Sequence, residues 1–142
     1  MKEISKYASM MYRCGQIYYN EKLKSYHIGC GQQFFLLHIY EKPGISQYEL
    51  AQMGNFDKGT TARAIKKLME LGYVERCSDE EDRRMVRLYV SKKGEPLIPI
   101  IHNMLEDWYE ALVTGFTKEE QKMVSSLMKR LGENAKKEVR SR

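Results

Sequence analysis

Along most of the chain, apolar residues recur every three or four positions, the spacing that places them on one face of a helix. This pattern predicts one helix over residues 3–24 and a second over residues 32–41. The second helix stops before Pro43, because the residue ahead of a proline is pushed out of the helical region. The same spacing returns in the last third of the chain, so the sequence predicts a mainly helical protein.

Two short helices in the middle of the chain have the clearest start signals. Ser46 and Glu49 form a capping box, in which each side chain can accept a hydrogen bond from the backbone amide of the other residue. Asp57 is a good N-cap for a helix over residues 58–71, which Gly72 would end. The sequence therefore predicts two consecutive short helices that are joined by a tight turn.

After these helices the apolar period changes from 3.6 to 2, which is the alternation of a β-strand. Residues 73–77 and 85–90 alternate in this way, and a polar segment, residues 78–84, separates them. The sequence thus predicts a β-hairpin with a charged tip. The predicted fold class is α+β, mainly helical.

The last third of the chain favours packing between helices. Its first apolar series alternates steps of three and four residues: Ile98, Ile101, Leu105, Trp108 and Leu112. This heptad-like spacing is typical of a helix that packs against another helix. Ser91 can cap this helix, and a second capping box, Thr117 with Glu120, opens a final helix.

Composition and charge narrow the function classes. The chain has 142 residues, of which 42% are hydrophobic and 30% charged, as in an ordinary globular domain. It contains neither a run of about 20 apolar residues that could span a bilayer nor a signal-peptide core. We therefore expect a cytoplasmic protein with no membrane partner. The net charge of +5 favours a polyanionic partner.

The order of two short helices and a hairpin is that of a winged helix-turn-helix. The second helix of such a unit enters the major groove of DNA with its N-terminal residues at the base edges. Arg63 is the best candidate for a base or phosphate contact, because its planar fork binds guanine or phosphate in a bidentate way. The hairpin adds Arg83, Arg84 and Arg87. An arginine at a hairpin tip suits the narrow minor groove, and Asp82 could hold Arg84 in position. Alternatively, the hairpin arginines only form ion pairs with the acidic residues 79–81 on a solvated surface.

These motifs together resemble the core of the MarR family (multiple antibiotic resistance regulators). The motifs are Glu49-Leu50-Ala51, Asp57-Lys58-Gly59-Thr60, Arg63, Leu68, Gly72-Tyr73-Val74-Glu75-Arg76, Asp82-Arg83-Arg84 and Ser91-x-x-Gly94. The flanking helices match the family as well, so the resemblance spans nearly the whole chain. One departure lies in the turn, where the chain has Gly54-Asn55 and the family often has Leu-Gly. Asparagine tolerates the left-handed conformation, and Met53 or Phe56 could replace the lost apolar contact.

The resemblance implies one domain over residues 1–142 that acts as a homodimeric transcriptional repressor on a palindromic operator in double-stranded DNA. The flanking residues 1–41 and 95–142 would supply the dimerisation helices, and residues 42–94 the winged helix-turn-helix. Within that unit, the helix-turn-helix would span residues 46–71 and the wing residues 73–91. A small molecule would release the repressor from DNA.

The residues and the resemblance give two sets of candidate contacts. The candidate DNA contacts are Gln47, Lys58, Gly59, Thr60, Thr61, Arg63, Lys66, Lys67, Asp82, Arg83 and Arg84. The candidate dimer contacts are Ile4, Tyr7, Met11, Ile101, Leu105, Trp108, Leu112, Leu127 and Leu131.

The nature of the effector stays open. Tyr12, Tyr19, His38 and Trp108 could line a cleft for a small aromatic ligand, or such aromatic side chains could fill the dimer core. Cys14 could make the chain a redox-sensing regulator, or it could be a small buried hydrophobe. Cys30 and Cys77 are less favoured than Cys14 as redox sensors. We expect no metal site, since the histidines lack the dense cluster with glutamates that zinc-responsive relatives use.

Two other function classes serve as alternatives. A winged-helix protein can use its wing for contacts with another protein instead of DNA. An enzyme is disfavoured, because the sequence has no nucleophile elbow, P-loop, Rossmann fingerprint or closely spaced pair of carboxylates. We therefore expect neither catalytic residues nor a cofactor.

Overall fold

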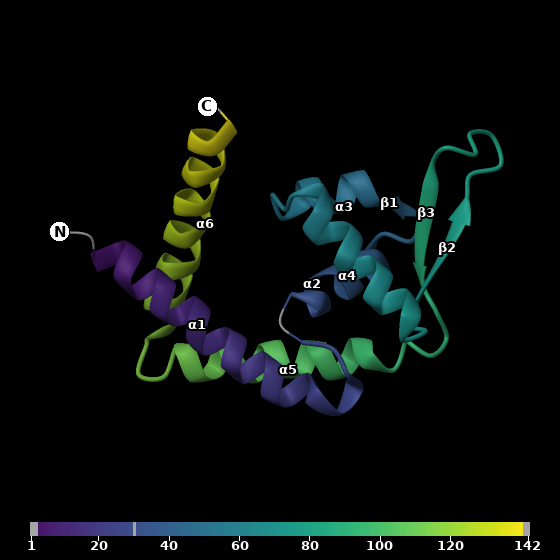
Figure 1. Cartoon of the computed structure of the whole chain (residues 1–142). Coiled ribbons are helices and arrows are strands. Elements are labelled where there is room, and N and C mark those ends of the chain that lie inside the picture. Colours follow the sequence, from purple (N-terminus) through teal and green to yellow (C-terminus); the bar gives the residue numbers. More distant parts are fainter. Residues whose placement is uncertain (1–2, 30, 141–142) are drawn as a thin grey trace. The chain divides into compact units, whose positions relative to one another are not determined.

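The structure of the protein, a computed structural model, describes residues 3–29 and 31–140 (Figure 1). The chain divides into two compact units, Met1–Glu106 and Asp107–Arg142. The elements in chain order are α1 (Glu3–Leu23), η1 (Lys24–Tyr26), α2 (Gln32–Glu41), β1 (Ile45–Ser46), α3 (Gln47–Met53), α4 (Lys58–Glu70), β2 (Val74–Ser78), β3 (Val86–Val90), α5 (Leu97–Leu112) and α6 (Lys118–Arg140). The predicted helices and hairpin are confirmed, with bounds that agree to within one residue where both ends were predicted.

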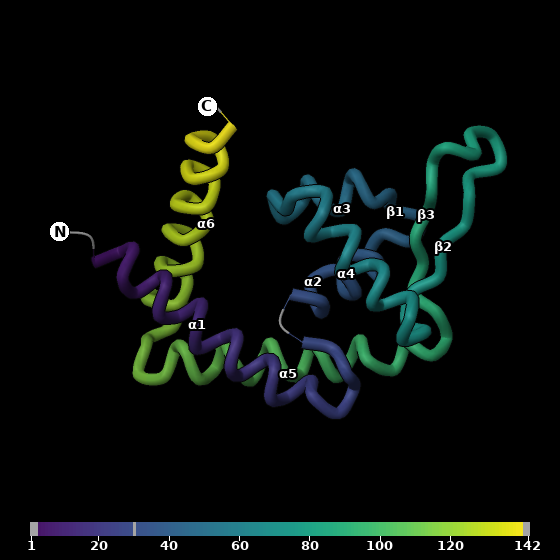
Figure 2. The backbone as a smooth tube through the Cα atoms, in the orientation of Figure 1, coloured from purple at the N-terminus to yellow at the C-terminus, as the bar shows by residue number. Residues whose placement is uncertain are grey.

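The sequence did not predict one strand, β1, which completes a three-stranded antiparallel sheet in the order β1-β3-β2. Ile45 lies opposite Leu88, and Ser46 lies opposite Arg87. A strand of two residues is too short to show an alternating pattern, so apolar periodicity cannot detect it. Figure 2 shows how the hairpin of β2 and β3 projects beyond the two short helices.

Ser91 caps the irregular turns over residues 92–96 and not the regular helix that follows them. The Ser91 hydroxyl donates to the carbonyl of Gly72 at 2.5 Å and accepts from the amide of Gly94 at 3.1 Å. It therefore fastens the end of β3 to the end of α4, and helix α5 begins only at Leu97, directly after Pro96.

The core of the first unit is built around α2, which packs against α3, α4 and β3. Phe35, Leu36 and Ile39 of this helix are almost completely buried. Ile101 of α5 belongs to the same core and is 0% exposed, so its assignment to the dimer interface is wrong. Helical spacing shows that a face is apolar, but it does not show whether that face meets its own core or a partner.

The turn between α3 and α4 is closed by an aromatic side chain. Asn55 adopts the left-handed conformation with φ 56°, as its residue type allows. The ring of Phe56 packs against the rings of Phe34 and Phe35, with centroid distances of 5.1 Å and 4.9 Å. Phe56 thus supplies the apolar contact of this turn, whereas Met53 is 45% exposed.

In the second unit, α6 is amphipathic but has no buried residue. Its N-terminus has the predicted capping box, since Thr117 N donates to Glu120 Oε1 at 2.8 Å and Glu120 N donates to Thr117 Oγ1 at 3.1 Å. An apolar stripe of Val124, Leu127, Met128 and Leu131 runs along the helix, with exposed fractions of 41–46%. Among the described residues, no helix is long and apolar enough to cross a membrane.

A substitution at Gly54 tests the tight packing of the turn. A Cβ atom there would collide with the Phe56 ring and lie 2.9 Å from Phe34 Cζ. We expect Gly54→Ala to destabilise the protein by about 1–3 kcal/mol, as overpacked cores do. In the control variant Gly132→Ala, on α6, the new methyl group would meet no atom within 4 Å. The control should gain up to about 1 kcal/mol of helix propensity. Equal unfolding midpoints in urea for both variants would contradict this account of the turn.

Candidate nucleic-acid interface

A capping box fixes the start of α3. The Ser46 hydroxyl accepts from Glu49 N at 3.1 Å, and Glu49 Oε1 accepts from Ser46 N at 3.3 Å. Lys42 Nζ donates to Glu49 Oε2 at 2.6 Å and is the main cause that lowers the pKa of this carboxyl group. Glu49 is therefore ionised at neutral pH, with its charge paired inside the cap.

The first turn of α4 carries a second polar cluster. Asp57 Oδ1 accepts from Thr60 N at 2.7 Å, and Asp57 Oδ2 accepts from the Thr60 hydroxyl at 3.0 Å. Arg63 Nη2 donates to the Thr60 oxygen at 3.3 Å. A Cβ atom on Gly59 would lie 3.1 Å from Arg63 Nη1, so glycine leaves room for the arginine to lie back along its own helix.

The two sides of α4 differ sharply in character. Ala64, Ile65 and Leu68 are buried in the core. The opposite side exposes four basic residues, Lys58, Arg63, Lys66 and Lys67, together with Gly59, while Thr60 is half-buried. The outer side of this helix is therefore a basic surface held in place by an apolar core.

Thr61 is wrongly included among the candidate DNA contacts. Its side chain is 0% exposed, and its hydroxyl donates to the backbone carbonyl of Asp57 at 3.0 Å. The residue lies one turn before Ile65 and two turns before Leu68 on the core side of α4, so it stabilises the helix start from within.

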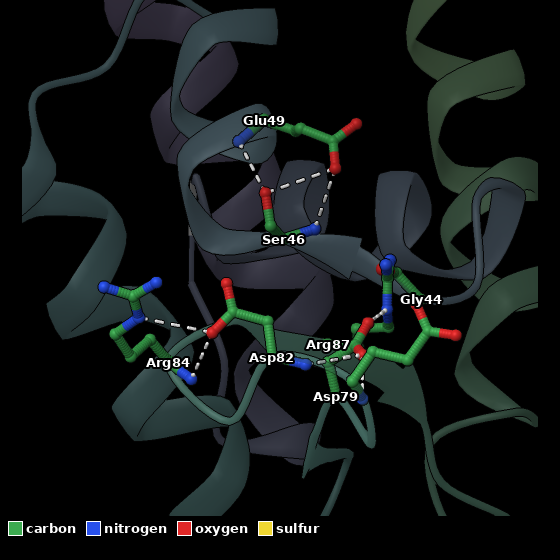
Figure 3. A network of polar contacts seen from close by, with 8 residues as sticks. Gly44, Ser46, Glu49, Asp79, Asp82, Arg84 and Arg87 are labelled. Atoms are coloured by element: carbon green, nitrogen blue, oxygen red, sulfur yellow. Dashed lines mark hydrogen bonds and ion pairs between the residues drawn. The ribbon is translucent and has the colours of Figure 1, made fainter.

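Two arginines of the wing differ in their surroundings, since Arg84 is exposed to solvent and Arg87 is bound within the protein (Figure 3). Asp82 Oδ1 accepts from both Arg84 N and Arg84 Nε, at 3.1 Å and 3.3 Å, as the sequence predicted. The side chain of Arg84 is nevertheless 93% exposed. Arg87 instead forms an ion pair with Asp79, in which Nε and Oδ2 are 2.8 Å apart. The alternative that hairpin arginines pair with the acidic segment thus describes Arg87, while Arg83 is exposed.

A groove of about 600 Å³ lies between the start of α3 and the wing. It is lined by Ser46, Gln47, Tyr48, Arg76, Asp82, Arg84, Met85 and Val86. Gln47 was a sequence candidate, but Tyr48 and Arg76 were missed. Arg76 is an exposed basic residue on β2, within the predicted wing, and it lies opposite Leu88 of the central strand, whose other neighbour is Ile45 beside α3.

Known proteins show the same sequence pattern and fold. The model of the MarR family matches residues 34–85. The uncharacterized HTH-type transcriptional regulator YybA of Bacillus subtilis is 33% identical over 138 residues, which cover 97% of this chain and 92% of that protein. The chain belongs to the MarR family.

Solved structures of MarR regulators agree with this membership. A MarR transcriptional regulator from Methanosarcina mazei is 39% identical, with 96% of this chain and 99% of that chain covered and a TM-score of 0.89. A putative MarR family regulator from Listeria monocytogenes, complexed with a 26mer DNA, is 28% identical. The match with the Listeria monocytogenes regulator covers 94% of this chain and 89% of the regulator, also at a TM-score of 0.89. This MarR-family chain is thus a helix-turn-helix transcriptional regulator and not an enzyme.

The four candidate effector residues of this MarR-family chain are distributed over three helices, α1, α2 and α5. Tyr12 of α1 is exposed, and Tyr19 of the same helix packs at the edge of the core. The ring of His38 on α2 packs at a tilt of 54° against Phe34, with a centroid distance of 4.2 Å, and its Nδ1 is 3.6 Å from Glu41 Oε2. Trp108 belongs to the second unit.

The cysteines are only partly as expected. Cys14 is exposed, so it is not the small buried hydrophobe that was one of its alternatives, and Cys77 is exposed as well. Cys30 lies outside the described residues. Within residues 3–29 and 31–140, no group of three or more histidine, cysteine or acidic side chains is arranged to hold a metal ion.

The pH dependence of stability tests the cap of α4. The amide of Thr60 is the main cause that lowers the pKa of Asp57 in the folded protein. A carboxyl group with a lowered pKa stabilises the fold above its unfolded pKa, and this contribution is lost as the pH falls through the folded pKa. We expect Asp57→Ala to lower the unfolding midpoint at pH 7, and the deficit to shrink below about pH 4.

Asp57→Asn is the matched control, because asparagine caps a helix about as well as aspartate but does not titrate. Urea unfolding of the three proteins between neutral pH and pH 3 measures the effect. A deficit of Asp57→Ala that stays constant over this range would show that the ionised carboxylate does not act as the cap.

Proposed function

We propose that this chain is a homodimeric repressor that binds a palindromic operator in double-stranded DNA and leaves it when a small molecule binds. The observation that carries the proposal is the basic outer side of α4, which presents Lys58, Arg63, Lys66 and Lys67 from a helix fixed to the core. The Listeria monocytogenes relative was solved with a 26mer DNA, which supports the same partner here.

In this proposal α4 enters the major groove, whose width admits a helix. Its first residues, Lys58 to Thr60, meet the DNA where the positive end of the helix dipole favours phosphate. Arg63 breaks its hydrogen bond to the Thr60 hydroxyl and instead binds a base edge or a phosphate. A hydrogen bond from its charged guanidinium to a phosphate is stronger than one between neutral groups. Arg83 and the highly exposed Arg84 reach the neighbouring minor groove.

Gln47 at the start of α3 faces the groove beside the wing and would contact the phosphate backbone between the two DNA grooves. Lys66 and Lys67 lie one turn beyond Arg63 on α4 and would bind phosphates in a way that carries no sequence information. Asp82 acts indirectly in this arrangement, through its hydrogen bonds to Arg84.

The domain arrangement we propose assigns residues 42–94 to DNA binding and residues 1–41 and 95–142 to dimerisation. Contiguous apolar surface is rarely left in contact with water. On α6, Leu127 and Leu131 are exposed along the apolar stripe. Further exposed apolar candidates are Ile4, Tyr7 and Met11 of α1 and Leu112 of α5. Leu105 and Trp108 are partly buried within the chain, and Leu105 packs on its own core.

For the effector we propose a small aromatic compound, for which Tyr12, Tyr19 and His38 of the first unit and Trp108 of the second are separate candidate contacts. The exposure of Cys14 favours an oxidant as a second candidate signal. Release of bound DNA by aromatic acids or by peroxide distinguishes the two. Cys14→Ser should abolish the response to peroxide and leave the response to aromatic compounds intact.

Selection from random double-stranded DNA tests DNA binding and yields the operator. The purified protein should retain fragments that share a palindromic sequence. On that sequence we expect Arg63→Ala to weaken binding by about 1–3 kcal/mol, roughly 5- to 150-fold, and to relax the preference at one base pair in each half-site.

The control Lys66→Ala should weaken binding similarly on all sequences and should lower the salt dependence, as expected for a phosphate contact. A wild-type protein that retains no fragment at low salt would overturn the proposal of DNA binding. An unchanged base preference in Arg63→Ala would remove this residue from the proposed base contacts.

Dimerisation is tested on the apolar stripe of α6. We expect Leu127→Gln with Leu131→Gln to yield monomers in sedimentation, because both side chains are exposed in one chain and would be covered only by a partner. The control pair Lys122→Gln and Lys129→Gln alters the polar side of the same helix and should leave the dimer intact. A dimer that persists in the leucine variant would exclude this stripe as the interface.

A further inference from the structure

The guanidinium of Arg87 is bound twice within the protein, by the carboxylate of Asp79 and by the backbone carbonyl of Gly44. We propose that Arg87 and Asp79 are positioning residues that hold the DNA-binding arginine of the wing, Arg84, in place relative to the helix-turn-helix. The inference rests on the proposed function and extends it to residues that do not touch DNA.

The first link joins the wing to the segment that precedes β1. Arg87 Nη1 donates to the carbonyl of Gly44 at 3.0 Å. The amide of Gly44 donates to the carbonyl of Leu88 at 2.8 Å, so this residue is bound to β3 through both of its backbone groups. Gly44 is buried with φ 87°, and a Cβ atom there would lie 3.3 Å from the hydroxyl of Tyr89. Only glycine combines this backbone conformation with so close an approach.

The second link fixes the loop at the tip of the wing. Asp79 uses Oδ2 to accept from Arg87 Nε, and Oδ1 to accept from the amides of Glu81 and Asp82 at 2.8 Å and 3.2 Å. These amides and the guanidinium lower the pKa of Asp79, whose side chain is only 18% exposed. The carboxylate therefore ties the loop backbone to the base of the wing at neutral pH.

The third link reaches the arginine that faces the solvent. Asp82, whose amide is bound by Asp79, accepts from Arg84 N and Arg84 Nε through Oδ1. A continuous series of contacts thus runs from Gly44 through Arg87, Asp79 and Asp82 to Arg84 (Figure 3). An arginine that is held before binding loses less conformational freedom when it enters the minor groove. Arg87 would therefore raise affinity without contacting a phosphate.

The salt dependence of binding separates a positioning residue from a phosphate contact. The slope of log K against log salt concentration is negative, and each lost phosphate contact makes it shallower by about 0.9. We expect Arg87→Leu to weaken binding to the selected operator about tenfold and to leave this slope unchanged. The control Lys66→Leu removes the same charge from α4. It should make the negative slope shallower by about 0.9, the value for one phosphate contact.

A double-mutant cycle asks whether Arg87 acts through Arg84. In the Arg84→Ala background, Arg87→Leu should cause no further loss, because the side chain that it positions is gone. Lys66→Leu should retain its full effect in that background. A general loss of fold stability would reduce affinity equally in both backgrounds, so it would not give this result.

Amide hydrogen exchange of the free protein verifies that the variant is folded. In Arg87→Leu the amides of Glu81 and Asp82 should exchange faster, while the amides of α4 stay protected. If Arg87→Leu unfolds, Asp79→Asn, which keeps an acceptor for these amides but loses the charge, is measured in the same cycle.

The outcomes distinguish the two proposals. Three results would each overturn the positioning role and leave DNA binding by the wild type standing. They are an unchanged affinity of Arg87→Leu, a negative slope made shallower by about 0.9 in this variant, and full additivity of its effect with that of Arg84→Ala. A wild type that binds no DNA would overturn the proposed function and this inference with it.

Discussion

The pairing of β3 with the two-residue strand β1 is the constraint on which the DNA-binding unit depends. Leu88, at the centre of β3, is fully buried and lies opposite Ile45 of β1 and Arg76 of β2. The next residue of β1, Ser46, is also the N-cap of α3. One residue thus belongs both to the sheet that carries the wing and to the helix-turn-helix. The orientation of the wing relative to α3 is therefore set by backbone hydrogen bonds as well as by side-chain packing.

This constraint explains how a segment without net charge can present a basic surface. Residues 46–91 hold eight basic and eight acidic side chains. Four of the acidic side chains are bound by neighbouring groups. Glu49, Asp79 and Asp82 form ion pairs with Lys42, Arg87 and Arg84, and Asp57 accepts a hydrogen bond from the amide of Thr60. The basic residues of α4 remain exposed on the outer side of that helix. The electrostatic character of the surface thus comes from the hydrogen bonds that the fold imposes and not from the composition.

Local signals made much of this unit predictable. The caps at Ser46 and Asp57 and the alternating hairpin strands depend on residues close in sequence, and all of them are present. Pairing between distant residues could not be read in the same way. β1 is too short to alternate, and the contact of Arg87 with Gly44 joins residues 43 positions apart. Thr61 is a different case, since its spacing from Ile65 and Leu68 already placed it on the core side of α4.

The apolar faces of the flanking helices differ in burial although their spacing is the same. The same spacing of three and four residues marks Ile98 and Ile101, which are buried in their own core, and Leu127 and Leu131, which are exposed. Composition does not separate the two groups, because both consist of branched aliphatic residues. What separates them is whether the chain itself supplies a covering surface, which depends on tertiary contacts. Burying the exposed group would stabilise an assembly by about 25 cal/mol per Å² of apolar area removed from water. The residues that one chain leaves uncovered are therefore the ones on which association between chains would act most strongly.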